Sequence, residues 1–387
     1  MIRVLYLSYD GLTDPLGQSQ ILPYLRLLSH EFSITIISFE KGERYVQNRD
    51  LIESICSENH IQWEPVTYHK FPPVISTLYD LWKLKRKAEF LHSVKNFDIL
   101  HCRSYVASLV GMSMKRKYGT RFLFDMRGFW ADERIESGLW NRKNFIYRSV
   151  YRFFKRKEKD FVMFADHIIS LTHRAKSEIL SWGNIPAPIT VIPTCVDLAL
   201  FDPGRISDGD KITLRQELKI HPDDFVLLYL GSWGSWYLTH EMLNYFREIK
   251  KTERSAKFLI ITPDPVHLEG DEFKEDVIIR TSLRGSVPLF VAISNAAIFF
   301  IKPSYAKMAS SATKMGEIMA MQIPFITNSG WGDVDEIIAA LAGKVTEIKM
   351  EGIDSFEITN GTGTRNYCFE TLSLRLVSET IGMYIES

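Results

Sequence analysis

Short apolar runs alternate with helical patterns along most of the chain, and this alternation limits the folds open to it more than any other feature. The first series contains IRVLYLS, FSITIISFE, FDILHC, RFLFDM and HIISLT, and the second contains DFVLLYLGS, AKFLIITPD, DVIIRTSL, AAIFFIKP and IPFITNS. Strands that alternate with helices form parallel sheets covered by helices on both faces. We therefore expect an α/β protein built from two doubly wound, Rossmann-like halves.

The two series are separated by VIPTCVDLALFDPGRISDGD, which is rich in Pro, Gly and Asp. Such a composition is typical of a linker, and 387 residues suit two domains. The sequence predicts a first domain over 1–192, a linker over 193–210 and a second domain over 211–370. A helical pattern over 371–387 predicts a terminal helix that packs back on the first domain.

Composition narrows the class of protein. Forty-seven basic and 47 acidic side chains give a formal net charge of zero, which argues against a general nucleic-acid binder. The four cysteines show neither CxxC nor Cys/His spacing, so a reducing cytoplasm is expected, with no zinc site or disulfide framework. The N-terminus lacks the apolar core of a signal peptide, and the longest apolar run, 289–301, is too short to span a bilayer. We expect a cytoplasmic protein, either soluble or peripheral on a membrane.

The segment from Ser310 onward, SSATKMGEIMAMQIPFITNSGWGDVDE, predicts a phosphate site. Ser310, Ser311 and Thr313 are candidates to cap a helix start, where backbone N–H groups and the positive dipole end favour an anion. Lys314 adds a cation, and Glu317 is the single carboxylate on the polar face of this helix. These residues indicate a nucleotide-sugar enzyme. A capped core helix with a solvated Glu317 is the alternative.

Three further features of the second half are donor-binding candidates. Gly231, Ser232 and Gly234 form a strand-to-helix turn whose backbone amides could hold a diphosphate. Lys302 follows the strand AAIFFI and Arg280 follows DVII, so either cation could oppose the charge of a leaving diphosphate. A surface side chain that extends to solvent is the alternative for each of them.

The loop after the first strand, SYDGLTDPLGQSQ, precedes a helix expected to begin near Gln18. Gly17 allows a ligand to approach the backbone closely, and we assign it to the donor. Asp10 and Gln18 are acceptor-binding candidates. An ordinary loop built on Gly and Pro is the alternative.

Polar side chains also follow two other strands of the first half. His101 and Arg127 are the acid/base candidates there, whereas Arg103 and Asp132 are candidates to orient an acceptor. A histidine at a strand end is often only a hydrogen-bonded structural residue.

Two remaining patterns concern metals and membranes. Asp333-Val-Asp335 resembles a DxD metal motif, but acidic residues also suit a helix start, so we expect no metal. The span 142–159 carries eight Lys or Arg among aromatics and could rest on an anionic membrane, with the cluster 83–87 as a second basic element. A solvated helix face is the alternative.

Taken together, these segments resemble the GT-B glycosyltransferases and, among them, the retaining family-4 enzymes of bacterial surface polysaccharide and glycolipid synthesis. The likeness covers almost the whole chain and rests on YDGLTDPLGQSQILPYL, FDMRGFWADER, VIPTCVDLALFDP, YLGSWGSWY, FFIKPS, SSATKMGEIMA, IPFIT, GDVDEII and YIES. The resemblance implies the GT-B fold, in which an acceptor-binding domain and a donor-binding domain face each other across a cleft.

The resemblance also assigns individual roles. Glu317 matches the second glutamate of the family's E-x7-E element, which is expected to hold the donor ribose, whereas Ala309 stands where the first glutamate should be. The basic pair that many relatives carry after the 231–234 turn is absent, and Lys302 and Lys314 are candidates to replace it. The family's acceptor-domain histidine falls near Arg127.

The implied activity is the transfer of a sugar from a nucleoside-diphosphate sugar, UDP before GDP, to a saccharide or lipid-linked acceptor. It would proceed with retention of anomeric configuration, without a metal or another cofactor. One alternative is a catalytically idle GT-B protein that binds a nucleotide or partners another transferase. Another is a nucleotide-sugar epimerase or hydrolase.

Overall fold

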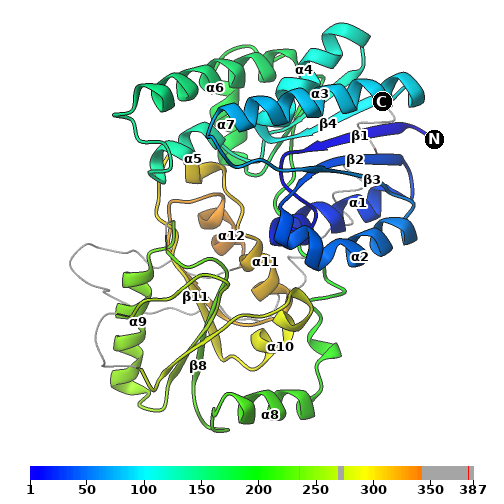
Figure 1. Cartoon of the computed structure of the whole chain (residues 1–387). Coiled ribbons are helices and arrows are strands. Elements are labelled where there is room, and N and C mark those ends of the chain that lie inside the picture. Colours follow the sequence, from blue (N-terminus) through cyan, green and yellow to red (C-terminus); the bar gives the residue numbers. More distant parts are fainter. Residues whose placement is uncertain (235, 269–273, 342–381, 383–387) are drawn as a thin grey trace. The chain divides into compact units, whose positions relative to one another are not determined.

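A computed structural model describes residues 1–234, 236–268, 274–341 and 382, and Figure 1 shows its elements. The chain divides into two compact units, the first comprising Met1–Pro193 and the second beginning at Thr194. The predicted linker, 193–210, contains one short 3-10 turn and the first residues of a helix. The helix predicted over 371–387 lies outside the described residues, apart from position 382.

The first unit contains a seven-stranded parallel sheet in the order β3-β2-β1-β4-β5-β6-β7. Its strands are β1 (Arg3–Ser8), β2 (Ser33–Glu40), β3 (Gln62–Thr67), β4 (Ile99–Arg103), β5 (Arg121–Asp125), β6 (His167–Ser170) and β7 (Ile189–Val191). Its helices are η1 (Gly17–Ile21), α1 (Leu22–Leu28), α2 (Gly42–Glu58), α3 (Ile75–Lys95), α4 (Ser104–Tyr118), α5 (Trp130–Glu136), α6 (Phe145–Phe164) and α7 (His173–Ser181).

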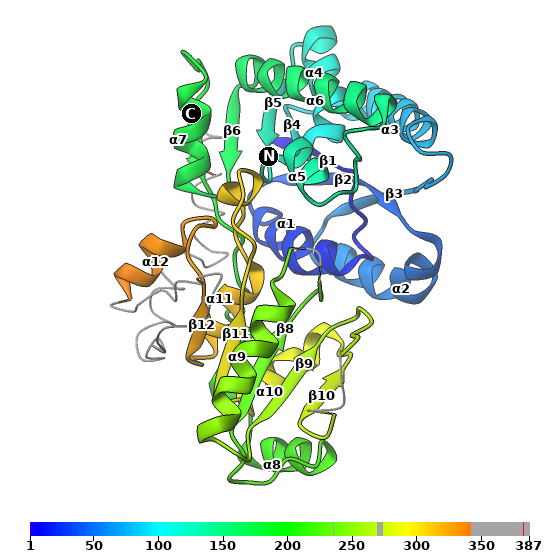
Figure 2. The ribbon, with the colours of Figure 1, turned by 90° about the vertical axis from the view of Figure 1, so that its left-hand side faces the viewer.

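Continuous apolar runs form the central strands of this sheet because both of its faces are covered. Helices α1 and α2 lie on one face and α3, α4 and α6 on the other (Figures 1 and 2). All five residues of β4 are buried, as expected for a parallel strand between two helix layers. β3 contains Pro65, which cannot donate to a ladder, and it lies at the sheet edge.

The second unit contains a five-stranded parallel sheet in the order β10-β9-β8-β11-β12. Its strands are β8 (Val226–Leu230), β9 (Lys257–Ile261), β10 (Val277–Arg280), β11 (Ala296–Phe299) and β12 (Phe325–Thr327). Its helices are η2 (Pro203–Arg205), α8 (Asp208–Glu217), α9 (Thr239–Thr252), η3 (Arg284–Ser286), α10 (Val287–Ala292), η4 (Ala306–Ala309), α11 (Thr313–Ala320) and α12 (Val334–Ala340).

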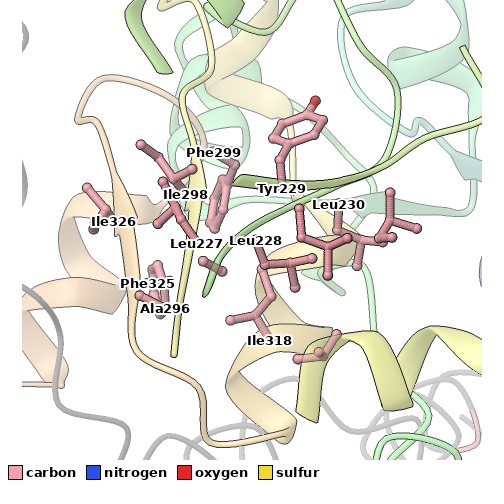
Figure 3. Packing of buried hydrophobic residues seen from close by; sticks show 14 of the residues in the cluster. Leu227, Leu228, Tyr229, Leu230, Ala296, Ile298, Phe299, Ile318, Phe325 and Ile326 are labelled. Atoms are coloured by element: carbon pink, nitrogen blue, oxygen red, sulfur yellow. The ribbon is translucent and has the colours of Figure 1, made fainter. Parts of the chain in front are cut away.

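The core of the second unit forms where β8 and β11 meet the helices that cover them. α9 covers one face of the sheet, and α10 and α11 cover the other (Figure 2). Leu228, Ile298 and Ile318 lie in one contiguous buried cluster (Figure 3). Ile318 belongs to α11, so apolar packing fixes this helix against the sheet.

Both sheets reverse their winding direction once, and each reversal marks a place for a ligand. In the first unit the chain moves outward from β1 to β3 and then returns beside β1 as β4; in the second it moves from β8 to β10 and returns as β11. Ligands of open α/β sheets bind beyond the carboxyl ends of the strands at such points. The predicted architecture of two doubly wound parallel sheets is confirmed, and the candidate residues can be located at the β1/β4 and β8/β11 ends.

Candidate functional site

The glycine turn after β8 leaves room for a buried cation. Gly231 and Gly234 have φ angles of +111° and +87°, a region that favours glycine. A Cβ atom at Gly231 would lie only 3.0 Å from Nζ of Lys314. The backbone angle therefore favours glycine at 231, and a side chain there would have to displace this ammonium group.

Lys314 lies beneath this turn and is held by aromatic side chains. Its Nζ lies 3.7 Å from the ring centroid of Tyr237 and 4.3 Å from that of Tyr229, and it donates a hydrogen bond to the Tyr229 hydroxyl at 3.2 Å. No carboxylate of the described residues forms an ion pair with Lys314, and burial lowers its pKa well below the usual lysine value. A cation in these surroundings would be stabilised by an anionic ligand.

The predicted capping of α11 by Ser310, Ser311 or Thr313 is wrong. The N-cap residue is Ala312, and it makes no side-chain cap hydrogen bond. The Ser311 hydroxyl instead accepts from the Thr194 backbone N–H at 3.0 Å. A bound anion at a helix start is favoured by the backbone N–H groups there and by the positive end of the helix dipole.

Glu317 is not a solvated carboxylate. It is 4% exposed, and its Oε1 lies 2.7 Å from a guanidinium nitrogen of Arg284 at the start of η3. Arg280, the predicted cation of this region, is exposed and donates to the backbone carbonyl of its neighbour Ile279. Arg284 also follows the strand DVII but was not predicted as a site residue. Ala309 is buried at the end of η4.

Lys307 is a second buried cation of this unit and was not predicted from the sequence. It lies five residues after the predicted Lys302. Nζ of Lys307 lies 4.0 Å from the ring centroid of Trp236, and the side chain is buried. Lys302 is exposed, and its backbone N–H donates to the Trp236 carbonyl at 2.8 Å. The backbone carbonyl of Ser232 accepts from the Tyr229 hydroxyl, which fixes the turn to β8.

In the first unit, a buried carboxylate holds the loop after β1. Glu40, at the end of β2, accepts from the backbone N–H groups of Leu12 at 2.8 Å and Thr13 at 3.1 Å, and from the Thr13 hydroxyl. A Cβ atom at Gly17 would lie 2.6 Å from Cα of Leu12, so only glycine fits there. The helical segment η1 begins at Gly17, next to the predicted start near Gln18, and the Gln18 side chain donates to the Thr13 carbonyl at 3.1 Å.

Two arginines converge at the carboxyl ends of β4 and β5. Arg103 and Arg127 both donate to Oε1 of Gln20, at 2.8 and 2.9 Å, and each has a guanidinium nitrogen 3.9 Å from the Asp125 carboxylate. Arg103 also donates to Asp10 at 3.4 Å. The structure thus joins the two predicted arginines through Gln20 and Asp125, which were not predicted, and joins Asp10 to the cluster through Arg103.

Asp125 and Arg127 keep buried polar atoms available. Within the described part of the chain, Oδ1 of Asp125 and Nε of Arg127 are buried without a hydrogen-bond partner. Burial and then the neighbouring Arg103 charge lower the pKa of Arg127. Burial is the largest single influence on Asp125 and raises its pKa, but the Arg127 charge, the contact with His101 and the Arg103 charge together hold the pKa of Asp125 below its ordinary value. Arg127 also has a φ of +54°, which is strained for a residue with a side chain.

His101 belongs to the same cluster as a neutral group. Its Nε2 lies 3.4 Å from Oδ2 of Asp125, and the ring is 2% exposed. Burial lowers the pKa of His101, and the Asp125 carboxylate only partly offsets this effect. A neutral imidazole beside a carboxylate can accept or relay a proton.

Asp132 is occupied by contacts with α6. Its two oxygens accept from the Tyr151 hydroxyl and the Lys155 ammonium, both at 2.8 Å. This geometry braces α5 against α6. Its predicted role with an acceptor therefore competes with a structural one.

The acidic pair of the DxD-like motif is placed at a helix start. Asp333 is the N-cap residue of α12, and Asp335 accepts from the Gly330 backbone N–H at 3.3 Å. The described residues contain no group of three or more His, Cys, Asp or Glu that could hold a metal ion.

The basic span 142–159 covers most of α6. Phe154, Glu158 and Phe161 form its buried side, whereas Arg148 and Arg152 are exposed. None of the helices in the described part of the chain is long and apolar enough to cross a membrane.

Comparison of the whole chain with solved structures defines its class as the GT-B fold. Sucrose-phosphate synthase from Thermosynechococcus elongatus aligns with a TM-score of 0.72 and 13% identity, covering 100% of this chain and 98% of that one. HepE from Anabaena, solved in complex with UDP-glucose, aligns with a TM-score of 0.71 and 13% identity over 100% of both chains.

Sequence comparison finds a family resemblance over part of the chain. Residues 25–200 match the model of Glycosyltransferase Family 4. D-inositol 3-phosphate glycosyltransferase 2 from Catenulispora acidiphila is 25% identical over 146 residues, which is 38% of this chain and only about a third (32%) of that relative. The chain thus has the GT-B fold, and its residues 25–200 resemble Glycosyltransferase Family 4, in agreement with the resemblance inferred from the sequence.

Proposed function

We propose that the chain is a glycosyltransferase that moves a sugar from a nucleoside-diphosphate sugar to a saccharide or lipid-linked acceptor, with retention of anomeric configuration. The GT-B fold and the family-4 match of residues 25–200 support the reaction class. Retention and a place in bacterial surface polysaccharide synthesis rest on the family resemblance.

The observation that carries the proposal is the buried cation under the β8 turn. Lys314, the glycine backbone at 231 and the uncapped start of α11 surround one place at the carboxyl end of the sheet. A diphosphate bound there would accept from backbone amides and from the ammonium group. As the diphosphate leaves, its growing negative charge would meet donors that are already in position.

The remaining roles follow from placement. In the second unit, Glu317 and its partner Arg284 would hold the donor ribose, and Lys302 would reach the diphosphate from solvent. In the first unit, the cluster of Arg103, Arg127 and His101 would orient the acceptor hydroxyl and accept its proton. No step of this scheme requires a metal or another cofactor.

UDP is the first nucleotide to test and GDP the second. HepE, which shares the fold, was solved with UDP-glucose. Because HepE is only 13% identical to this chain, it guides the order in which nucleotides are tested and nothing more.

A cytoplasmic, peripheral location is part of the proposal. The exposed arginines of α6 and the basic residues of 142–159 suit the anionic inner face of a membrane. A lipid-linked acceptor would be met on that face.

The second candidate is a GT-B protein that binds a nucleotide without transferring a sugar. Ala309 favours it, because a buried methyl group stands where the family's first glutamate contacts the transferred sugar. An epimerase or hydrolase differs from both in converting a donor without an acceptor.

The deciding experiment is calorimetric titration of UDP, GDP, ADP and CMP into the wild type, Lys314→Met and Lys302→Met. Lys251→Met serves as the matched control, because Lys251 is an exposed cation at the far end of α9. We expect one diphosphate to bind and Lys314→Met to weaken it at least tenfold, with the control unchanged. If none of the four nucleotides binds, the transferase proposal fails. If binding occurs without turnover across donors and acceptors, the second candidate is favoured.

A further inference from the structure

The outer face of α3 carries a stripe of exposed apolar side chains. Counting about 100° per residue, they fall on one side of this 21-residue helix and opposite to its buried side. The stripe, defined here as the α3 stripe, consists of six side chains between 48% and 66% exposed: Ile75, Leu78, Tyr79, Trp82, Phe90 and Val94.

The buried side of α3 is already fully used. Leu84 and Ala88 are completely buried, and α3 packs against α4. Asp80, also fully buried, accepts from the Tyr9 hydroxyl at 3.0 Å and from the His69 backbone N–H at 3.1 Å. These contacts fix the rotation of the helix, so the α3 stripe is a second apolar face. A helix that is apolar on both sides requires an apolar environment on the outer one as well.

The charges around the stripe indicate what that environment is. α3 carries five Lys or Arg against two Asp or Glu, although the whole chain has no net charge. The Arg86 guanidinium lies 5.7 Å from the Trp82 ring centroid, and Nζ of Lys83 lies 5.6 Å from that of Tyr79. Cations beside Trp and Tyr suit the headgroup layer of an anionic membrane, where rings lie at the interface and cations meet lipid phosphates.

A second basic helix lies on the same face of the sheet. α6 also packs against α4 and lies with α3 and α4 on one side of the strands (Figures 1 and 2). It carries six Lys or Arg against two Asp or Glu. The positive charge of this face is therefore shared by two helices, whereas the larger set of exposed apolar side chains belongs to α3.

We propose that the α3 stripe inserts into the headgroup layer of an anionic lipid bilayer. This proposal deepens the peripheral location stated above, and it moves the inserting surface from the predicted span 142–159 to α3. It does not depend on sugar transfer. The helix would lie along the membrane surface, with its basic side chains at the phosphates and its aromatic rings among the upper acyl chains.

The test is co-sedimentation of the full chain with vesicles of phosphatidylcholine alone or mixed with phosphatidylglycerol, at low and high salt. The test variant combines Leu78→Ser, Trp82→Ser and Phe90→Ser, which change exposed side chains only. The control combines Val46→Ser and Leu51→Ser, exposed apolar residues of α2 in the same unit. A third variant combines Phe145→Ser, Ile146→Ser and Phe153→Ser on α6.

We expect the wild type to bind mixed vesicles and to bind less in high salt. The α3 variant should lose at least tenfold in partition coefficient, the α6 variant should lose less, and the α2 control should match the wild type. Trp82→Phe should remove part of the fluorescence quenching caused by brominated lipid. Equal binding by the α3 variant and the wild type would overturn the proposal, as would failure of the wild type to bind. A wild-type dimer that the α3 variant converts to a monomer would assign the stripe to a second copy instead.

UDP titration of the same variants without vesicles separates this proposal from the enzymatic one. The α3 stripe belongs to the first unit, so the α3 variant should keep the wild-type nucleotide affinity. If none of UDP, GDP, ADP and CMP binds to any of these proteins while vesicle binding is intact, the transferase proposal fails and the membrane surface stands.

Discussion

Lys314 has an uncommon position for a single side chain, because its ammonium group is buried between tyrosine rings rather than paired with a carboxylate. Water is replaced there by two ring faces and one hydroxyl. These groups compensate the loss of hydration only in part, so burial lowers the pKa of Lys314. The side chain therefore loses its proton at a lower pH than an ordinary lysine, whose pKa is about 10.4.

A pH dependence of diphosphate binding follows from this residue. Only the protonated Lys314 attracts a diphosphate, so the affinity for UDP should fall as pH rises from about 7 to 10, with a midpoint below the ordinary lysine pKa. Calorimetry across this range measures the effect. Lys314→Arg, which stays protonated, should bind with little change over the same range. A constant wild-type affinity would contradict the role given to Lys314.

Gly17 offers a second prediction at the residue scale. Its Cβ would meet the backbone of the loop held by Glu40, and backbone cannot move aside as a side-chain end can. Gly17→Ala should lower the free energy of unfolding by about 1–3 kcal/mol, a typical cost of overpacking. Gly42→Ala is the control, because a Cβ at Gly42 meets nothing within 4 Å. Equal denaturant midpoints for the two variants would show that the loop adapts.

At the scale of elements, the ion pair between Glu317 and Arg284 joins α11 to η3. Glu317→Ala would leave the guanidinium without its carboxylate and should lower the free energy of unfolding by about 1–3 kcal/mol. A nucleotide titration of this single variant would not distinguish damage to the fold from loss of a ribose contact.

A matched set of variants separates these two effects. Glu317→Gln keeps a hydrogen-bond acceptor for Arg284, and Arg284→Met combined with Glu317→Leu removes both charges. If Glu317 holds the ribose, Glu317→Gln should retain most of the stability while UDP affinity falls. If denaturation curves and UDP titrations change in parallel in all variants, the residue acts only through the fold.

The elements themselves could be predicted from the sequence to different degrees. Every apolar run quoted for the two series became a strand, because burial on both faces requires continuous Val, Ile, Leu and Phe. β3, with the sequence QWEPVT, and the three-residue β7 were missed, since an edge strand needs less apolar surface. The start of α11 was placed well, but its cap was wrong because the Ser311 hydroxyl binds Thr194, a residue distant in sequence.

The candidate site was predicted less completely for a related reason. Single residues that follow strands, such as Arg103 and Arg127, could be named from their positions alone. Their common partners, Gln20 and Asp125, have no motif, and only the strand order brings them together. Lys307 and Arg284 were likewise visible as cations, but the burial of Lys307 and the ion pair of Arg284 with Glu317 were not.

At the scale of the whole molecule, the two units divide the proposed reaction between a cation-rich donor site and an acceptor cluster. The scheme uses side-chain cations and backbone amides in place of a metal. Transfer from the preferred donor should therefore be unchanged by EDTA, and the product should keep the anomeric configuration of the donor, as read by nuclear magnetic resonance of the anomeric proton. Loss of activity in EDTA, restored by manganese, would promote the Asp333/Asp335 pair to a metal site.

The bond between Ser311 and Thr194 makes the first residue of the second unit a built-in reporter. Thr194 donates its amide hydrogen to the Ser311 hydroxyl, and its own hydroxyl donates to the Ser311 carbonyl. A ligand that orders the start of α11 should also slow hydrogen–deuterium exchange at the Thr194 amide, far along the chain from the ligand contacts. The occupancy of the nucleotide site could then be followed at the joint between the units, in the intact protein and without any label.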